Sequence, residues 1–272
     1  MGTYLDRIVE AHRTSAAADQ RPLGALRDDA LAHADTAIRR DFVSALTVPG
    51  LSVIAEIKRR SPSKGALNAT LDPAATAQAY ASGGAACLSV LTDADHFGGS
   101  AHDLQSARAA VSLPVLRKDF TVCAADVYDT ALMGADAVLL IVAALSDAEL
   151  TALLIVANEL RLASLVEVHD EAELERAVAA GALLIGVNQR DLHTFEVDTQ
   201  RAVRVAAAMP SHVVRVAESG VRHRDDAAVL AAAGFDAVLV GESVVTAGDP
   251  ASAVAALRCI EVPRTVSTRT DG

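Results

Sequence analysis

The sequence predicts an α/β protein built as a (β/α)8 TIM barrel with extra N-terminal helices. Two observations predict this fold: eight short β-branched runs follow one another along the chain, and Ala-rich amphipathic stretches separate them. The runs are apolar nearly throughout, which is typical of parallel strands that are buried on both faces. A doubly wound open sheet would need a nucleotide loop of the form G-x-G-x-x-G after its first strand, and this loop is absent.

The chain begins with a predicted helical extension. The stretches YLDRIVEAHR and RRDFVSAL predict one or two helices that pack on the barrel rather than form a separate domain. The charged start has no apolar segment of the kind that signal peptides carry. We therefore expect a helical extension over residues 1–48, the barrel over residues 49–260, and a loose polar tail over residues 261–272.

The barrel strands are expected in regular alternation with helices. Several of the Ala-rich stretches open with Asp or Ser and close with Gly, as helices do. Phrases such as GADAVLLI and GFDAVLV, in which a helix-ending Gly precedes a buried strand, recur roughly every 50 residues, or about two strand–helix units. The predicted strands are residues 53–58, 87–92, 114–118, 137–142, 164–169, 184–188, 213–219 and 237–242.

Composition argues against several classes of function. A net charge of −11, with no cluster of Lys and Arg, argues against a nucleic-acid partner. The three cysteines lie far apart and predict neither a disulfide framework nor a metal site. The strongest apolar run, residues 137–145, is about half as long as a membrane span. We expect a cytoplasmic protein with no membrane partner, and we favour a monomer over a homo-oligomer.

Charged side chains interrupt the predicted strands near their carboxyl ends, where barrels of this kind build active sites. Glu56 and Lys58 lie two residues apart in the first strand, so they share one face. Lys118 ends the third strand, and Glu167 lies in the fifth. If these faces line the barrel, two acids and two lysines meet over an apolar floor, where an unpaired charge is costly. The strands therefore predict an acid–base site rather than polar residues that merely fill the barrel mouth.

Glycines follow the seventh and eighth predicted strands. Gly220 lies in the motif ESG and Gly241 in the motif GES, and we expect each to stand just before a helix N-terminus. Backbone N–H groups and the helix dipole bind phosphate at such positions, often after strands 7 and 8 of this fold. Ordinary turn glycines are the alternative, but the paired location favours a phosphate site.

Other polar residues give weaker signals. His169 follows Glu167 by two residues and is expected to be a core or rim residue rather than a ligand. Asp93, Asp95 and His96 could suggest a cation site, but no second cluster of ligands accompanies them. We therefore predict no metal.

The motifs on the strands resemble, in order, the signature blocks of the indole-3-glycerol phosphate synthase family. These blocks are VIAEIKRRSPSKG, LSVLTDADHFGGS, LPVLRKDF, LVEVHDEAEL, IGVNQRDLHTFEVD, VAESGV and DAVLVGES. The resemblance covers about residues 50–245 and the helical extension. It implies a carboxy-lyase of tryptophan biosynthesis that closes 1-(2-carboxyphenylamino)-1-deoxyribulose 5-phosphate to indole-3-glycerol phosphate, releasing CO₂ and water with no cofactor.

The resemblance also implies catalytic roles. Lys118 matches the general acid of ring closure, and a dry, cation-rich pocket is expected to lower the pKa of its ammonium. Glu167 matches the general base that completes the indole. Lys58 would pair with substrate anions and serve as acid in the dehydration, although which lysine protonates which oxygen stays open. An orienting acid, an amide that holds an intermediate and a further acid complete the set: Glu56, Asn188 and Glu218.

Substrate-binding residues follow from the same resemblance. The phosphate is expected on the backbone and side chains of Lys58, Ser219, Gly220, Gly241 and Glu242. The anthranilate end and its loops are expected at Ser61 and Arg190, with an apolar wall formed by Pro62, Phe97, Phe120 and Leu139. The sequence departs from the family pattern at Gln189, at His96 and at the variable position of Glu242, none of which is a proposed proton-transfer residue.

Alternative functions stay open at this point. Another phosphosugar enzyme, phosphoribosylanthranilate isomerase, would need a Cys and Asp pair at strand ends that here carry other residues. An aldolase would form a Schiff base on Lys118, which borohydride would trap in the presence of substrate. A non-catalytic barrel that binds a partner is a third possibility, and the joint presence of Lys118 and Glu167 argues against it.

Overall fold

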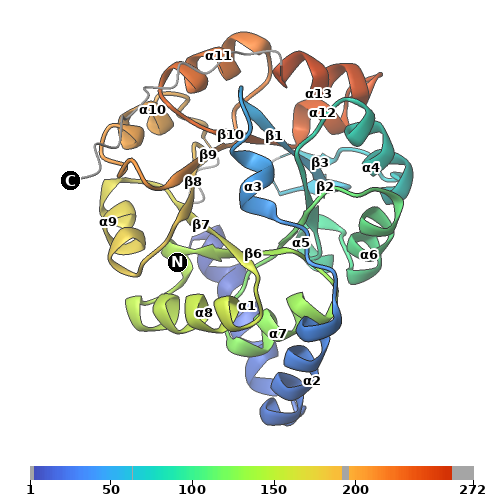
Figure 1. The fold of residues 1–272 in the computed structure, drawn as a ribbon, viewed down its shortest axis with the longest axis vertical. Helices are drawn as coiled ribbons and strands as arrows, with labels where there is room; N and C mark the ends of the chain where they lie inside the picture. The colour runs from blue at the N-terminus through green and yellow to red at the C-terminus, as the bar shows by residue number, and fades with distance from the viewer. Residues whose placement is uncertain (1–2, 63, 192–195, 259–272) are drawn as a thin grey trace, which may run out of the picture.

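The computed structural model describes residues 3–62, 64–191 and 196–258. Eight parallel strands close into a barrel in the order β1-β10-β9-β8-β7-β6-β5-β4, so the predicted fold is confirmed (Figure 1). Each strand agrees with its predicted range to within two residues. The barrel strands are β1 (Ser52–Ile57), β4 (Cys87–Leu91), β5 (Val115–Lys118), β6 (Ala137–Ile141), β7 (Ala163–Val168), β8 (Leu184–Asn188), β9 (Val214–Glu218) and β10 (Ala237–Val240).

Helices surround the barrel in alternation with the strands (Figure 1). Side chains of Asp72, Ser146 and Asp170 accept backbone N–H groups at helix starts, as the sequence predicts for these residue types. The helices are α4 (Pro73–Ser82), α5 (Ala94–Phe97), α6 (Ala101–Ala110), α7 (Ala124–Leu132), α8 (Asp147–Glu159), α9 (Glu171–Ala179), α10 (Arg201–Ala206), α11 (Arg224–Ala232), α12 (Glu242–Val245) and α13 (Pro250–Arg258), with a 3-10 turn, η1 (Val142–Ala144), after β6.

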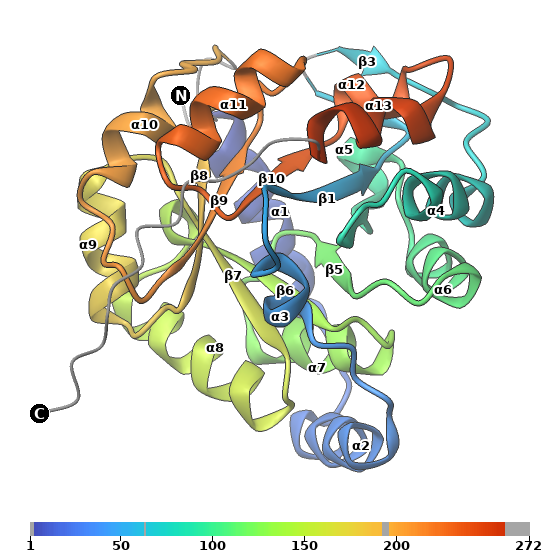
Figure 2. The same ribbon diagram turned by 45° about the horizontal axis from the view of Figure 1, so that its top comes forward.

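Three helices precede the barrel where one or two were expected: α1 (Tyr4–Ala18), α2 (Leu23–Thr36) and α3 (Phe42–Leu46). Helix α2 packs against α7 at the outside of the barrel (Figure 2). Helix α3 lies across the centre of the ring of strands in Figure 1, and its Phe42 and Leu46 are buried among residues of the barrel interior. The predicted stretches YLDRIVEAHR and RRDFVSAL contain most of α1 and all of α3, whereas α2, whose buried face consists of Leu26, Ala30 and Ala34, was not expected as a separate helix.

Side chains along each strand alternate between two layers. In β1, Val53, Ala55 and Ile57 belong to the layer between strands and helices, whereas Ile54 faces the barrel interior. The interior layer is closely filled with aliphatic residues that include Leu116, Leu139, Leu165 and Leu239. These aliphatic side chains fill the barrel interior beneath the carboxyl ends of the strands. The polar side chains lie above them, at the carboxyl ends.

A small hairpin follows the first barrel strand. It pairs β2 (Arg60–Ser61) with β3 (Gly65–Ala66) in antiparallel fashion. Strands of two residues carry no readable alternation, so the sequence did not predict this hairpin. Arg59 ties the loop down through an ion pair with Asp103 on α6. Within the described ranges, no helix has the length and apolarity that crossing a bilayer requires.

Candidate active site

A cavity of about 560 Å³ opens at the carboxyl ends of the strands. It brings together every residue that the sequence assigned to a site, from Glu56 on β1 to Glu242 on α12. Parallel strands all end on the same side of a closed barrel, so residues far apart in the chain meet there. The assigned residues around the cavity are Glu56, Lys58, Ser61, Pro62, Phe97, Lys118, Phe120, Leu139, Glu167, Asn188, Arg190, Glu218, Ser219, Gly220, Gly241 and Glu242.

Lys118 lies between two buried carboxylates. Its Nζ is 2.8 Å from Oε2 of Glu167 and 2.6 Å from Oε2 of Glu218. The side chain of Lys118 is 15% exposed, and those of the two acids are nearly inaccessible. A buried charge is tolerated when it is paired in this way, so the two acids fix the ammonium at the top of the barrel.

The environment of Lys118 is anionic, and the expectation of a cation-rich pocket that lowers its pKa is wrong. Burial alone would lower the pKa of Lys118, but the negative charges of Glu167, Glu218 and Glu56 outweigh burial and raise the pKa above its ordinary value. The sequence placed acids and lysines at one site without showing how many acids face each lysine. Lys118 is therefore a protonated ammonium at neutral pH.

The two carboxylates that share Lys118 titrate very differently. Burial opposes ionisation of Glu167, but the charge of Lys118 outweighs it and lowers the pKa of Glu167 to about 2. For Glu218, burial together with the charge of Glu167 outweighs the pull of Lys118, and its pKa is raised to about 7. One ammonium thus holds one carboxylate ionised, while its neighbour exchanges a proton near neutral pH.

This raised pKa predicts a stability change with pH. Because the folded-state pKa of Glu218 lies above its unfolded value, its contribution is full below about pH 4.5 and is lost as the pH rises through about 7. A Glu218→Gln variant keeps a neutral side chain, so its free energy of unfolding should fall less than that of the parent between pH 5 and pH 8, by about 2–3 kcal/mol. Urea unfolding at several pH values measures this difference. If the free energy of unfolding changed with pH by the same amount in the parent and the variant, the prediction would be refuted.

Glu56 and Lys58 form a second ion pair beside the first. Lys58 Nζ lies 2.5 Å from Oε1 of Glu56, as the shared parity of the two residues predicted. A Cβ on Gly241 would come within 2.3 Å of that oxygen and 3.0 Å of Nζ. Gly241 therefore matters for its lack of a side chain as well as for its backbone. The ion pair of Glu56 and Lys58 occupies the space that a side chain on Gly241 would fill at the end of β10.

Asn188 joins the acid cluster to the next loop. Its Nδ2 donates to Oε1 of Glu167 over 3.1 Å, and its Oδ1 accepts the backbone N–H of Arg190 over 3.0 Å. Asn188 also lies opposite Glu218 in the register of β8 and β9. The amide thus orients Glu167 from the side opposite Lys118, which leaves one face of that carboxylate toward the cavity.

Gly186 is a site residue that the sequence reading missed. A Cβ at this position in β8 would lie 2.1 Å from Oε1 of Glu218 and 3.2 Å from Cδ1 of Leu165. The signal was available, because a glycine inside the strand LIGVN often marks a close approach by another group. The missing side chain makes the space in which the Glu218 carboxyl group lies.

A Gly186→Ala substitution is expected to displace the Glu218 carboxyl group and to lower turnover by about tenfold to a hundredfold, since misplacement by about 1 Å has costs of this size. Steady-state kinetics on the folded variant checks this. Gly24→Ala is the matched control, because a Cβ there meets no atom within 4 Å. Full activity in Gly186→Ala would contradict the role given to the glycine.

The predicted phosphate end differs from expectation in one respect. Gly241 directly precedes α12, but α11 begins at Arg224, four residues after Gly220, so only Gly241 stands at a helix start. Ser219 and Gly220 instead both adopt left-handed backbone, with φ of 67° and 76°. Gln189 supports this turn by donating from Nε2 to the Ser219 carbonyl over 2.7 Å. A strained serine at the end of a barrel strand is typical of a binding site.

An apolar group lines the cavity at the ends of β4 and β5, and β5 lies across the barrel from β9, whose end carries Ser219 and Gly220. The rings of Phe97 and Phe120 are 6.3 Å apart between centroids, and Pro62 and Leu139 also line the cavity. A flat aromatic ligand fits such a slot, since offset and tilted ring contacts are favourable at this separation. The cavity thus combines an apolar end and a polar, glycine-lined end, with the two ion pairs between them.

Helix α1 covers the cavity, which the sequence did not reveal. Its Tyr4, Leu5 and Ile8 line the wall, although the pattern showed only that the helix would pack on the barrel. Which face of an extension meets the site depends on how the chain crosses the barrel, and no local signal encodes this. Arg13 secures the helix through an ion pair of 2.8 Å with Glu149.

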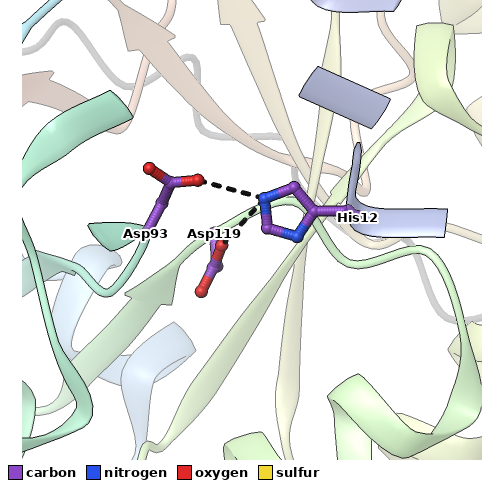
Figure 3. A group of neighbouring side chains, drawn as sticks. All are labelled: His12, Asp93 and Asp119. Carbon is purple, nitrogen blue, oxygen red and sulfur yellow. Dashed lines mark hydrogen bonds and ion pairs between the residues drawn. The ribbon is translucent and has the colours of Figure 1, made fainter. Parts of the chain in front are cut away.

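His12 fastens the same helix to the strand ends. Its Nε2 lies 3.0 Å from Oδ2 of Asp93 and 3.9 Å from Oδ1 of Asp119. Figure 3 shows the ring pointing toward both carboxylates. These three side chains are close enough to hold an ion. The carboxylates, however, already accept protein donors, including the backbone N–H groups of His96 and Phe120. We interpret the contacts of His12 with Asp93 and Asp119 as interactions that hold α1 against the barrel.

Comparison with protein families supplies a chemical context. The family model described as indole-3-glycerol phosphate synthase matches residues 5–257. The indole-3-glycerol phosphate synthase of Mycobacteroides abscessus is 50% identical over 256 residues, which span 94% of each chain. That of Mycolicibacterium vanbaalenii is 51% identical over 256 residues, with 94% of this chain and 93% of the relative covered.

A solved structure matches the fold at much lower sequence identity. Thiamine phosphate pyrophosphorylase from Pyrococcus furiosus superposes with a TM-score of 0.59 and 17% identity, over 76% of this chain and 94% of that one. A likeness at this level of identity concerns the barrel alone.

Proposed function

We infer the chemistry of this site from one premise: the chain belongs to the indole-3-glycerol phosphate synthase family. It is accordingly a carboxy-lyase of tryptophan biosynthesis. It converts 1-(2-carboxyphenylamino)-1-deoxyribulose 5-phosphate to indole-3-glycerol phosphate, with loss of CO₂ and water. The alternatives, namely an isomerase, an aldolase and a silent barrel, are not favoured.

The observation that carries the assignment of roles is the position of Lys118 between Glu167 and Glu218. We propose that the substrate lies with its aromatic ring against Phe97 and Phe120 and its phosphate at the ends of β9 and β10. The ketone between these two ends then reaches the ion pairs. The apolar slot and the glycine-lined end of the cavity support this orientation.

Ring closure is the step that we assign to Lys118. The aromatic carbon that bears the carboxylate attacks the ketone carbon, and the ketone oxygen takes a proton from Nζ as negative charge develops on it. A donor with a raised pKa stays charged at neutral pH, so it stabilises the developing charge before the proton moves. The neutral amine is left beside two carboxyl groups, one of which can return a proton to it.

Decarboxylation and dehydration come next, and we assign them to the same cluster of acids and lysines. Loss of CO₂ returns an electron pair to the ring, and the hydroxyl then leaves as water when an acid protonates it. Lys58, paired with Glu56, is our choice for this acid. Glu167 takes the proton from the carbon next to the nitrogen, because its low pKa keeps it ionised and Asn188 holds its other oxygen. Glu56 orients Lys58 and the substrate hydroxyls.

The phosphate is proposed to lie against the backbone of Ser219, Gly220, Gly241 and Glu242, with Lys58 as the nearby cation. The left-handed turn at Ser219 and the helix start at Gly241 favour this placement. Ser61 and Arg190 are proposed to hold the anthranilate carboxylate and the loops around it. The Glu242 side chain points toward Lys64 and Arg190 at 3.7 and 4.0 Å, so its charge is partly balanced.

A monomer in the cytoplasm is proposed as the working form. The residues to which the proposed steps are assigned all lie in this chain. Residues 1–48 are proposed to act with the barrel as a single unit, because α1 covers the cavity and α3 fills the opposite end. The proposed tail, residues 261–272, lies outside the described residues.

A direct assay tests the proposed function. Purified protein mixed with the carboxyphenylamino-deoxyribulose phosphate should yield a fluorescent indole product and one CO₂ for each product molecule. Circular dichroism of the same sample establishes that the chain is folded. A folded sample that forms no indole would refute the assignment, and a product still bearing the carboxylate would favour an isomerase instead.

A further inference from the structure

His169 connects the acid cluster to a second cavity. It follows β7 and lies on the same face as Glu167, with Nε2 at 3.8 Å from Oε1 of that residue. Its Nδ1 lies 3.0 Å from Oε2 of Glu173 on α9, which also accepts the backbone N–H of His169. Nε2 itself is buried, and no described residue forms a hydrogen bond with it. A buried imidazole nitrogen that faces a catalytic carboxylate calls for an explanation.

The second cavity has a volume of about 240 Å³ and is strongly polar. His169 lines this cavity but not the main one, and Leu5 of α1 lines both cavities. Several of its charged residues are exposed, so solvent reaches it. The charged and titratable groups around it come from the β7–α9 loop, α9, the β8–α10 loop and α10: His169, Asp170, Glu171, Glu173, Asp191, Arg201 and Arg204.

The proposed reaction needs a proton from solution at every turnover. The ketone oxygen leaves as water and so takes two protons, whereas the carbon next to the nitrogen gives up one. The carboxylate leaves as neutral CO₂, so one further proton must enter. Lys118, Glu167 and Glu218 are almost closed to solvent, so the proton needs a path to them.

We propose that His169 carries protons from the second cavity to Glu167 and thereby restores the Lys118 ammonium after each turnover. This inference rests on the function proposed above. The surroundings of His169 suit the role on geometric grounds, since one ring nitrogen faces the catalytic carboxylate and the other faces a carboxylate of the second cavity. A small side-chain rotation would bring this separation of 3.8 Å to hydrogen-bond length.

The proposed transfer is balanced in each step. The Nε2–H bond of the His169 imidazolium breaks as an O–H bond forms on Glu167. In each turnover Glu167 passes two protons to Lys118, the one that it took from carbon and the one that His169 supplies, and it becomes a carboxylate again after each transfer. One of these protons restores the Lys118 ammonium. The other moves on to Glu56, whose charge also acts on Lys118, and from the Glu56 carboxyl group to the neutral Lys58 amine with which Glu56 pairs. The neutral His169 ring then takes a proton from water or buffer acid in the second cavity.

Charge around His169 keeps it ready to donate near neutral pH. Burial would lower its pKa, but the hydrogen bond to Glu173 and the charges of Glu167 and Glu173 raise the pKa above the ordinary value. Arg201, on the far side of the cavity, acts in the opposite direction. The ring is thus protonated at the pH at which Glu167 is ionised.

The test replaces His169 and supplies a mobile proton donor. We expect His169→Ala to lower kcat by about tenfold or more with little change in KM, and added imidazole to restore much of the loss in proportion to its concentration. The ratio of kcat in H₂O to kcat in D₂O should rise in the variant, because proton delivery becomes the slow step. A role in packing alone would produce neither the rescue nor the isotope effect.

Two further variants keep the test decisive. Glu173→Gln retains a hydrogen-bond acceptor for the ring but removes the charge that holds it protonated, so it should show a smaller loss and the same imidazole dependence. His102→Gln, on the exposed face of α6, is the matched control and should behave as the parent. Imidazole-independent kinetics in both His169→Ala and Glu173→Gln would overturn the relay. An inactive parent protein would instead refute the proposed function itself.

Discussion

Lys118→Ala is expected to lower turnover by about 10²–10⁴-fold, the range that a general acid contributes, while the substrate still binds. The substitution removes the proton donor for ring closure and also the charge between Glu167 and Glu218. Because ring closure precedes decarboxylation, the variant should release neither CO₂ nor indole in a single turnover. Rapid quenching with mass spectrometry measures both products, and titration of the substrate against the variant measures binding.

Lys118→Arg is the matched control for the charge. A guanidinium keeps the cation between the two carboxylates but does not give up a proton at any working pH. We therefore expect the arginine variant to recover thermal stability relative to the alanine variant and to remain nearly inactive. If Lys118→Arg turns over close to the parent rate, Lys118 acts through its charge alone and the acid has been misassigned.

Glu167→Gln is expected to lower turnover by about 10²–10⁴-fold through a different step. Glutamine preserves the shape of the side chain and can still contact Asn188 and Lys118, but it cannot take a proton from carbon. Ring closure needs no base, so CO₂ should appear in the first turnover while indole formation is delayed. A decarboxylated intermediate that still carries its hydroxyl group should accumulate, and mass spectrometry can detect it.

The paired substitution distinguishes a lost base from a general disturbance. Glu175→Gln removes the same charge from an exposed position on α9 and should leave turnover unchanged. Equal loss of CO₂ and indole in Glu167→Gln would place its defect at ring closure, together with that of Lys118, and would contradict the assignment of separate steps to the two residues.

Local patterns were sufficient to predict the barrel and its strands. A strand buried on both faces is marked by a run of apolar, β-branched residues, and glycine marks the helix end before it, as at Gly134 and Gly234. Parity within one strand correctly placed Glu56 beside Lys58, since alternation is a property of any extended chain. The β2–β3 hairpin was not predicted because its strands are shorter than any readable period, and α2 was not predicted as a separate helix because its buried face is mostly alanine.

The fold, the end of the barrel that carries the polar residues and, through the resemblance of the motifs, the family and its reaction could all be predicted from local patterns. How those residues meet depends on the folded chain. Lys118 and Glu218 are 100 positions apart, so no local signal shows that they share an ion pair of 2.6 Å or that Lys118 faces more acids than cations. The space at Gly186, the α1 cover and the position of His169 between two cavities likewise depend on the register and closure of strands distant in the chain. Hydrophobic periodicity is local, whereas electrostatic environment is a sum over neighbours that only the folded chain brings together.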